Sequence, residues 1–409
     1  MKALLKSDLI VLILLVSSLS MGSVRAQSFY INNHRNHINV PFRIVRNMVV
    51  VQAYINDKGP FNFILDTGVG LMVITDPELV ESVNIIKSRT INLGGWGEGK
   101  DLEAYITTPL QIDIRGLRSK DVSAAIFKED HFGLSNYAGI PICGLLGYEF
   151  FSNLVVKINF EDSLLTAYRP KQLKIQKKYT GIPISVEQSK PYLKAQVRYR
   201  DSSERSCKLI VDLGAGHPLS LENDEAKIVC ATGSISANLG MGINGPSIGK
   251  ISRVNELDLG QFVLKNVLTS FPDKEMKNVL PVHRDGSLGL DILKRFKLII
   301  DYPDSMIYFK PGYNLKEPFE HDMSGLEYYS GGDEFKRVII GRVEPGSAAA
   351  KIGLEKDDEL LSINLVPVTK MTLEDIDHLF RSREGRKLLL EVYRNKKYAD
   401  VILTLQKRI

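Results

Sequence analysis

The stretch NFILDTGVGLMVIT, residues 62–75, places one acidic residue between two apolar runs and next to a glycine. Residues 63–65 precede Asp66, and residues 71–74 follow the glycine-containing segment. Short apolar runs that are rich in β-branched residues and bounded by glycine are typical of buried strands. Burying an ionised carboxylate without a partner is strongly unfavourable. Asp66 is therefore expected to be either a hydrogen-bond acceptor in a turn or a chemically active group.

A second copy of this pattern lies in CKLIVDLGAGHPLSLE, residues 207–222, where Asp212 follows another apolar run. The two acids are 212 − 66 = 146 residues apart. The same features follow each acid in the same order, and these are a glycine-rich hairpin, a short strand pattern and an apolar segment containing Leu-Gly. A lone aspartate before glycine is more often a turn acceptor than a catalyst. Two acids in one ordered constellation indicate an internal duplication.

A duplicated fold with a pseudo-twofold axis would bring Asp66 and Asp212 together. Glycine turns let backbone N–H groups approach each carboxylate closely. Two adjacent carboxylates do not both ionise easily, so they share one proton and titrate as a pair. The unprotonated acid accepts a proton from water while the protonated acid donates to a carbonyl oxygen. This chemistry suits the attack of water on an amide.

These residues resemble the Asp-Thr/Ser-Gly aspartic peptidases, specifically the bilobal bacterial relatives of the retropepsins, over about residues 28–315. The resemblance implies a mostly β, two-lobed acid-protease fold that hydrolyses peptide bonds with Asp66 and Asp212. It also implies catalytic turns supported by Thr67, Gly68, Leu213 and Gly214. The hairpins match flaps that close over substrate, which places flap positions at Gly94, Gly95, Trp96, Gly240 and Gly242. Packing against the protein and contact with substrate are equally open roles for Trp96.

One position departs from the family pattern, which has a hydroxyl residue after each aspartate. Thr67 follows the pattern and Leu213 does not. In the family these hydroxyls reach across the axis to the opposite backbone. The loss would leave the acids loosely held, or a backbone shift would compensate. The alternative function is therefore a catalytically inactive peptide-binding protein that retains the cleft. A homodimer like the viral proteases is disfavoured because this chain already contains both halves.

His217 lies close to Asp212 in the sequence and suggests a His-Asp pair. No GxSxG elbow or reactive-cysteine context completes a triad, so we interpret it as a polar residue at the start of a strand. The sequence also has no CxxC, HExxH or histidine cluster, so we expect no metal and no cofactor. Cys207 and Cys230 are candidates for one disulfide, which spacing alone does not test. Cys143 is expected to be a small buried hydrophobe.

The last part of the chain, residues 322–409, resembles a bacterial PDZ domain, a small α+β unit, most specifically in VEPGSAAAKIGLEKDDELLSIN, residues 343–364. Residues 373–380 are expected to form an amphipathic helix after a capping box. By resemblance, a peptide C-terminus would bind as an added strand. The alternative is a PDZ fold that only packs on the protease, with its groove empty or self-filled. The positions implied for peptide binding are Ser324, Gly325, Leu326, Leu373 and Ile376.

The first 26 residues have the features of a secretory signal peptide. Lys2 and Lys6 form the positive end, LIVLILLV the apolar core, and Val24-Arg25-Ala26 the cleavage site. An uncleaved membrane anchor is the alternative, although the apolar run is short for a span. We therefore expect an exported protein, periplasmic or extracellular, with no stable membrane span after cleavage. The predicted units are residues 1–26, 28–170, 171–315 and 322–409.

The charge of the chain excludes one class of partner. The net charge is +5, and the first 26 residues contribute +2 through three basic residues and Asp8, so the mature chain is near +3. That charge is too small to indicate nucleic-acid binding, and no basic block with interleaved aromatic residues occurs. The sequence therefore predicts an exported aspartic endopeptidase that acts on peptides or proteins and carries a PDZ domain.

Overall fold

A computed structural model describes residues 28–32, 35–93, 102–127, 132–222, 233–242, 245–273 and 282–409. The predicted signal peptide, the flap positions Gly94, Gly95 and Trp96, and Cys230 all lie outside these residues. In the described ranges, no helix is both long enough and apolar enough to span a membrane.

The described residues of the first lobe form an eleven-stranded sheet with the order β1-β10-β9-β4-β5-β12-β6-β11-β8-β7, and β3 pairs with β4. Three short helices, α2 (Pro77–Ser82), α3 (Leu134–Ala138) and α4 (Tyr148–Phe151), accompany it. The strands are β1 (Tyr30–Ile31), β3 (Arg43–Val45), β4 (Met48–Ile55), β5 (Lys58–Leu65), β6 (Met72–Ile74), β7 (Lys87–Leu93), β8 (Leu102–Thr107), β9 (Leu110–Ile114), β10 (Leu117–Val122), β11 (Ala124–Phe127) and β12 (Gly144–Leu146).

The second lobe, as far as it is described, contains an eight-stranded sheet with the order β16-β17-β18-β23-β19-β22-β21-β20, followed by helix α6 (Leu290–Leu293). The strands are β16 (Ser185–Glu187), β17 (Lys190–Arg198), β18 (Glu204–Val211), β19 (Leu219–Leu221), β20 (Ile235–Gly242), β21 (Gly245–Leu259), β22 (Phe262–Pro272) and β23 (Gly286–Leu288).

The two sheets repeat one pairing pattern, as the duplication predicts. In the first lobe, β12 runs parallel to β5 and places Leu146 opposite Leu65, just before Asp66. In the second lobe, β23 runs parallel to β18 and places Leu288 opposite Val211, just before Asp212. Both apolar segments with glycine thus lie beside the strand that leads to an aspartate. These strands are buried, which explains why they read as continuous apolar runs.

A six-stranded sheet joins the lobes in the order β15-β25-β24-β13-β14-β2. Its central pair is antiparallel, with Val156 of one lobe opposite Ile300 of the other. Three strands come from each half of the chain, and a single hydrophobic core extends through both lobes. The strands are β2 (His37–Pro41), β13 (Val155–Asn159), β14 (Leu164–Tyr168), β15 (Thr180–Pro183), β24 (Phe296–Asp301) and β25 (Met306–Pro311).

The C-terminal unit has its own sheet, in the order β26-β27-β28-β30-β31 with β29 paired to β28, and its own hydrophobic core. The predicted amphipathic helix is α8 (Leu373–Phe380), and its capping box between Thr372 and Asp375 is present. The other elements are β26 (Leu326–Gly331), η2 (Asp333–Phe335), β27 (Arg337–Val343), α7 (Ala348–Lys351), β28 (Glu359–Ile363), β29 (Val366–Pro367), η3 (Val368–Lys370), β30 (Lys387–Arg394) and β31 (Lys397–Thr404). The short helix η1 (Tyr313–Lys316) precedes this unit, and its Leu315 packs on the core of the lobes.

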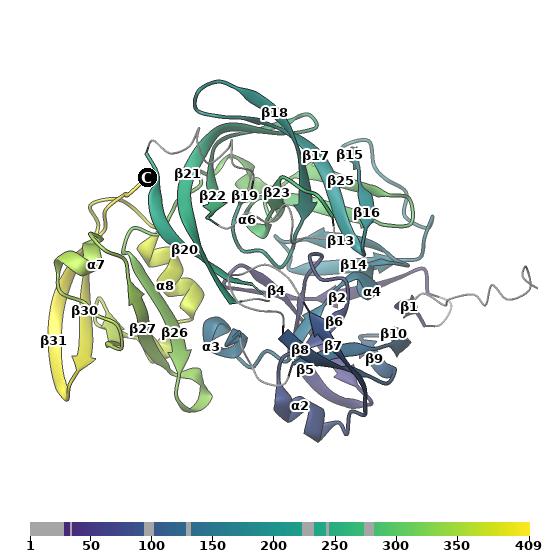
Figure 1. Ribbon diagram of the computed structural model, residues 1–409, viewed down its shortest axis with the longest axis horizontal. Coiled ribbons are helices and arrows are strands. Elements are labelled where there is room, and N and C mark those ends of the chain that lie inside the picture. The colour runs from purple at the N-terminus through teal and green to yellow at the C-terminus, as the bar shows by residue number, and fades with distance from the viewer. Residues whose placement is uncertain are drawn as a thin grey trace, which may run out of the picture.

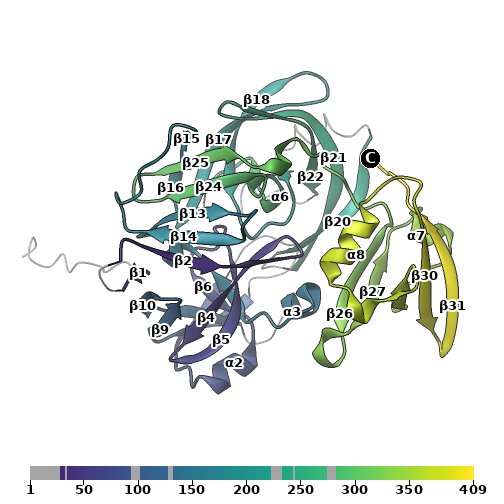
Figure 2. The ribbon, with the colours of Figure 1, turned by 180° about the vertical axis from the view of Figure 1, so that it is seen from behind.

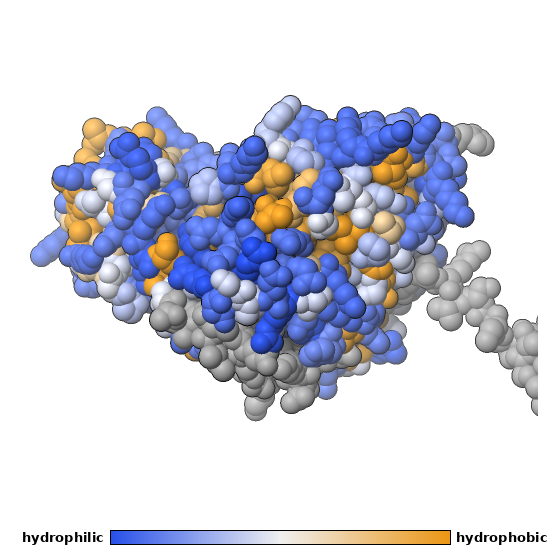
Figure 3. Space-filling model, turned by 90° about the horizontal axis from the view of Figure 1, so that it is seen from above, coloured by the Kyte–Doolittle hydropathy of each residue, from blue (hydrophilic) through white to orange (hydrophobic). Residues whose placement is uncertain are grey.

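The C-terminal unit lies beside the two lobes, and its β26 and α8 are on the side that faces them (Figures 1 and 2). Helix α3 of the first lobe and strand β20 of the second lobe are the neighbouring elements in both views. On the face shown in Figure 3, hydrophobic residues form separate patches between larger hydrophilic areas. The fold class is therefore mostly β, with two related lobes and an α+β unit, as the sequence predicts.

Candidate active site

Each predicted aspartate follows the end of a buried strand and is held by the turn after it. The Asp66 backbone N–H donates to the Leu146 carbonyl at 2.9 Å, and the Gly68 N–H donates to Asp66 Oδ1 at 2.7 Å. These bonds fix the orientation of the first carboxylate and satisfy part of its hydrogen-bonding capacity.

The second turn repeats this geometry. The Asp212 N–H donates to the Leu288 carbonyl at 2.9 Å. Asp212 Oδ1 accepts from the N–H groups of Gly214 at 2.9 Å and Ala215 at 3.1 Å. Backbone donors of a glycine turn therefore partly satisfy each acid in the same way in both halves.

The two carboxyl groups lie close together across the axis, and each is packed against the turn that carries the other. A Cβ atom added to Gly68 would lie only 2.7 Å from Asp212 Oδ2. A Cβ atom on Gly214 would likewise overlap the carboxyl group of Asp66. Each acid therefore lies over the glycine of the opposite turn, and a side chain at either glycine would push the acids apart.

The electrostatics of the pair favour a shared proton. Asp66 is buried, with 8% of its surface exposed. Burial and the negative charge of Asp212 raise the pKa of Asp66 well above its ordinary value. The Gly68 N–H and the positive charge of Lys190 act in the opposite direction on this pKa. One carboxyl of the pair thus keeps its proton at a pH where isolated carboxylates are ionised.

The expected pattern has one hydroxyl from each half hydrogen-bonded to the backbone of the other half, and this chain has one of these two hydroxyls, that of Thr67. Thr67 Oγ1 donates to the Val211 carbonyl at 2.6 Å and accepts from the Leu213 N–H at 3.0 Å. The hydroxyl of one half therefore binds the backbone of the other half beneath the acids. The reciprocal bonds are chemically impossible because leucine has no hydroxyl, and the Leu213 side chain is buried in the core instead. The acids nevertheless remain in contact.

Two hairpin turns lie against the aspartate loops of the opposite lobe. Asn47, between β3 and β4, donates from Nδ2 to the Gly216 carbonyl and accepts from Lys294 Nζ at 2.8 Å. In the other half, a Cβ on Gly70 would lie 3.2 Å from Ser189 Cβ, in the turn between β16 and β17. The next residue is Lys190, whose charge acts on both acids.

Sequence reasoning missed Asn47 and Lys190. The signal was present upstream of each aspartate, in FRIVRNMVVVQAYI and ISVEQSKPYLKAQV, residues 42–55 and 184–197. Extending the duplication to these segments aligns the two hairpins. Each turn contains residues with positive φ, which suits asparagine and other short polar residues.

His217 belongs to the surroundings of Asp212. Its Nε2 lies 2.7 Å from Ser287 Oγ. Burial lowers the pKa of His217 to about 4, and the neighbouring negative charge of Asp212 opposes this shift. The ring is therefore neutral at ordinary pH and serves as a hydrogen-bonding group. Arg284, which forms an ion pair with Glu222 at 2.8 Å in the same lobe, lowers the pKa of His217 further through its positive charge.

Gly240 and Gly242 lie near the end of β20, in a hairpin with β21. Gly240 has φ +111°, a conformation that other residues rarely adopt. The same hairpin contacts the C-terminal unit, where Asn238 Nδ2 donates to Glu327 Oε2 at 2.9 Å. The partner flap positions Gly94, Gly95 and Trp96 lie outside the described residues, so their role stays a prediction.

The residues implied for PDZ peptide binding are brought together, but their donors are engaged within the chain. The N–H groups of Ser324 and Gly325 donate to Asp322 Oδ1 at 3.0 and 2.6 Å, and the Leu326 N–H donates to Ser324 Oγ at 3.0 Å. Leu373 and Ile376 lie on α8 and are buried. A peptide carboxylate at this loop would therefore have to replace these internal bonds.

Across the described ranges, no cluster of three or more histidine, cysteine, aspartate or glutamate side chains could hold a metal ion. Cys143 and Cys207 are buried free thiols. Burial raises the pKa of Cys143 to about 12 and that of Cys207 to about 11, so both stay protonated at ordinary pH. The proposed partner of Cys207 at position 230 lies outside the described residues.

Comparisons with known proteins identify both parts of the chain. Residues 51–150 match the family described as "Aspartyl protease", a range that includes Asp66 but not Asp212. Residues 339–394 match the family described as "PDZ domain". No curated protein matches the chain.

Two solved structures show weak similarity. The aspartic proteinase from Irpex lacteus has 14% sequence identity and a TM-score of 0.45, covering 69% of this chain and 99% of that chain. The photosystem II D1 C-terminal processing protease has 22% identity and a TM-score of 0.20, covering 21% of this chain and 23% of that chain. The assignment of the two domains therefore depends on the family matches and not on these structures.

Proposed function

We propose that this chain, which combines an aspartyl-protease region with a PDZ domain, is an exported endopeptidase whose nucleophile is a water molecule between Asp66 and Asp212. The observation that carries the proposal is the close approach of the two carboxyl groups, each placed over the glycine of the opposite turn. This arrangement supplies one base and one acid to the two sides of a peptide carbonyl.

The reaction needs one proton on the pair. The ionised carboxylate removes a proton from water as the oxygen attacks the carbonyl carbon. The protonated carboxyl donates its proton to the carbonyl oxygen, which gives a neutral tetrahedral diol. Collapse of the diol breaks the C–N bond. The protonated acid donates its proton to the leaving nitrogen, and the ionised acid takes a proton from a diol hydroxyl, which leaves one proton on the pair. The raised pKa of Asp66 supports this cycle because it keeps one acid protonated.

The second candidate is a catalytically inactive protein that binds peptides in the same cleft, and the missing hydroxyl at Leu213 favours it. Splayed acids would fit that function, whereas acids within hydrogen-bonding reach fit catalysis. The contact between Asp66 and Asp212, together with the Thr67 bonds to the opposite backbone, supports the enzyme.

The test is cleavage of a diverse peptide library by the chain beginning at Gln27, read by mass spectrometry from acid to neutral pH. Asp66→Asn and Asp212→Asn serve as controls because each replaces one acid by a neutral isostere. Cleavage that disappears in both variants supports the shared pair. A folded wild-type chain that retains peptides but cuts none supports the binding protein. N-terminal sequencing of the protein recovered from the producing cells tests export and cleavage before Gln27.

A further inference from the structure

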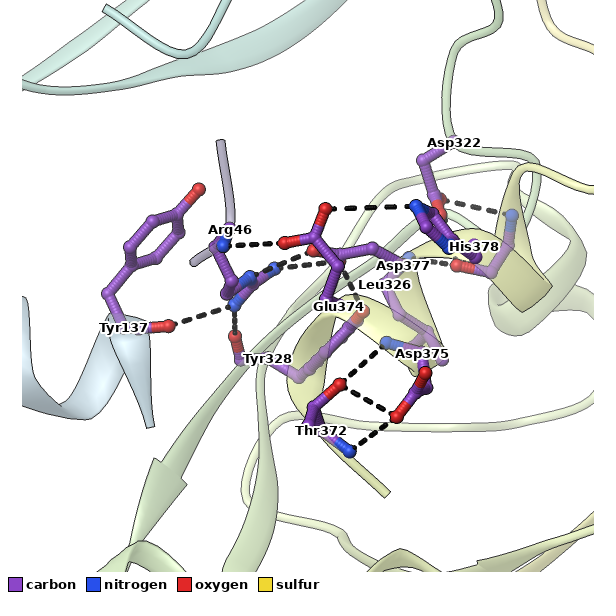
Figure 4. A network of polar contacts seen from close by, with 11 residues as sticks. Arg46, Tyr137, Asp322, Leu326, Tyr328, Thr372, Glu374, Asp375, Asp377 and His378 are labelled. Atoms are coloured by element: carbon purple, nitrogen blue, oxygen red, sulfur yellow. Dashed lines mark hydrogen bonds and ion pairs between the residues drawn. The ribbon is translucent and has the colours of Figure 1, made fainter. Parts of the chain in front are cut away.

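The groove between β26 and α8 of the PDZ domain is filled by an arginine from the first protease lobe (Figure 4). Arg46 lies in the turn between β3 and β4. Its Nη1 donates to the Tyr328 carbonyl on β26 at 2.9 Å. Its Nε and Nη2 donate to the two carboxylate oxygens of Asp377 on α8, at 3.1 and 3.0 Å. One side chain thus binds both walls of the groove.

Further contacts and burial distinguish the environment of Arg46 from an exposed ion pair on the surface. The Arg46 backbone N–H donates to Glu374 Oε2 at 2.7 Å. The guanidinium carbon lies 4.4 Å from the ring centre of Tyr137 and 4.7 Å from that of Tyr328. The arginine side chain is 9% exposed. Paired N–H bonds to one carboxylate, with aromatic rings beside the guanidinium, form the stronger class of arginine recognition.

The loop at residues 324–326, which is expected to bind the carboxylate of a peptide C-terminus, has its N–H groups engaged within the chain. Asp322 Oδ1 accepts the N–H groups of Ser324 and Gly325, and Ser324 Oγ accepts the N–H of Leu326. The carboxylate of Asp322 and the hydroxyl of Ser324 therefore already occupy the donors that would hold a terminal carboxylate. Recognition in this groove has to come from its acidic and aromatic walls.

We propose that the β26–α8 groove binds an extended peptide segment with an internal arginine, and that Arg46 is the intramolecular stand-in for that arginine. The peptide would lie along β26, its guanidinium would take the place of that of Arg46 on Asp377 and Tyr328, and a backbone N–H would replace that of Arg46 on Glu374. Arginine fits better than lysine because the Asp377 carboxylate is bound by two parallel N–H groups. The inference deepens the peptide-binding part of the proposed function and does not depend on catalysis.

Binding of such a peptide competes with contacts between the domains. The peptide displaces Arg46 and also the bond from Asn136 Nδ2 of α3 to the Ser330 carbonyl, which is 2.8 Å long. The affinity of the intact chain is reduced by the fraction of molecules in which the groove is closed. Removing Arg46 should therefore raise the affinity for the peptide. The neighbouring Asn47 binds the Gly216 carbonyl of the catalytic loop, so groove and loop share one turn.

The experiment measures fluorescence anisotropy of two labelled peptides on the Asp66→Asn chain, which does not depend on cleavage. One peptide alternates valine and threonine around a single central arginine, and the other has glutamine in that position. We expect Arg46→Ala to raise the affinity for the arginine peptide about tenfold or more. The glutamine peptide stays weak, and amidation of the peptide C-terminus changes nothing. The control Arg43→Ala, an exposed arginine on β3, leaves both affinities unchanged.

Asp377→Asn added to Arg46→Ala should abolish the gain, which separates this groove from the catalytic cleft. Equal affinities of the Arg46→Ala chain for both peptides, no gain in affinity for the arginine peptide, or a gain that survives Asp377→Asn would overturn the proposal. A second measurement keeps Arg46 in place, in case its loss loosens the domain. An excess of arginine peptide should increase hydrogen exchange in the turn between β3 and β4, and an unchanged rate also contradicts the proposal. If the chain cleaves no peptide in the library, that result contradicts the proposed endopeptidase activity and leaves the peptide-binding proposal unaffected.

Discussion

Thr67 and Leu213 are joined across the pseudo-twofold axis by a single side-chain hydroxyl. The Thr67 Oγ1 atom accepts from the Leu213 N–H at 3.0 Å and donates to the Val211 carbonyl at 2.6 Å. Both residues are buried. The hydroxyl of Thr67 alone thus links the two aspartate turns. At position 213, a buried apolar side chain takes the place of the second hydroxyl.

Loss of this hydroxyl should reduce turnover more than folding. Thr67→Val keeps the shape but leaves the Leu213 N–H and the Val211 carbonyl without their partner. We expect kcat to fall by roughly 10- to 100-fold, since small displacements of reacting groups are costly, and stability to fall by about 1–3 kcal/mol. Thr67→Ser keeps the hydroxyl and should retain most of the turnover. A Thr67→Val variant with wild-type kcat would show that catalysis does not require the hydrogen bonds of the Thr67 hydroxyl.

The pH dependence of cleavage should reflect the raised pKa of Asp66. Activity requires one proton on the pair, so it persists as the pH rises past the ordinary carboxyl range and falls only as the raised pKa is passed. Lys190→Met removes a positive charge that lowers this pKa. The alkaline limb of kcat/KM should then move to higher pH, as measured from a full pH profile.

The matched control for that profile is Lys194→Met, because Lys194 is an exposed lysine on the same strand, β17. The alkaline limb of the kcat/KM profile of Lys194→Met should coincide with that of the wild type. A Lys190→Met limb that stays in place, or moves to lower pH, would show that the Lys190 charge does not reach the pair.

A buried glutamate should make stability depend on pH. Glu149 is 4% exposed, and its Oε2 has no hydrogen-bond partner among the described residues. Burial raises the pKa of Glu149 to about 7 from an ordinary value of 4.5. The folded state therefore holds a proton that the unfolded state releases, so stability is lost as the pH rises from 4.5 to about 7.

Glu149→Gln should remove this loss because glutamine carries no charge at any pH. The free energy of unfolding at pH 8 should rise relative to pH 5 by roughly 2–3 kcal/mol compared with wild type, as measured by denaturant titration at both values. Glu81→Gln, an exposed position at the end of α2, should leave the pH dependence unchanged. An identical pH dependence in the Glu149 variant would refute the assignment.

The turn that contains Asn47 should matter for catalysis although it makes no contribution to the reacting atoms. Asn47→Ala removes the bond to the Gly216 carbonyl and the acceptor for Lys294. Because Gly216 lies on the loop of Asp212, kcat/KM should fall by about tenfold. Asn266→Ala is the control, since both asparagines have positive φ, 61° and 52°, and the backbone strain of alanine is therefore matched. Equal losses in both variants would mean that strain alone explains the effect.

The sequence by itself determined the mostly β class, the duplication, the two aspartate turns and the PDZ unit. These features are local, since apolar periodicity, glycine positions and the capping box act between residues that are close along the chain. The consequence of Leu213 was left open, because the Thr67 hydroxyl that binds its backbone N–H belongs to the opposite lobe.

Only the tertiary structure decided how the two aspartate turns are held and which group fills the PDZ groove. Asn47 and Gly216 are separated by 169 residues, and Arg46 and Glu374 by 328. No local pattern encodes such contacts, because they depend on how three packed units meet. The arginine that looks like an ordinary turn residue in the sequence is buried against two acidic side chains, since the fold closes the PDZ domain onto the turn between β3 and β4.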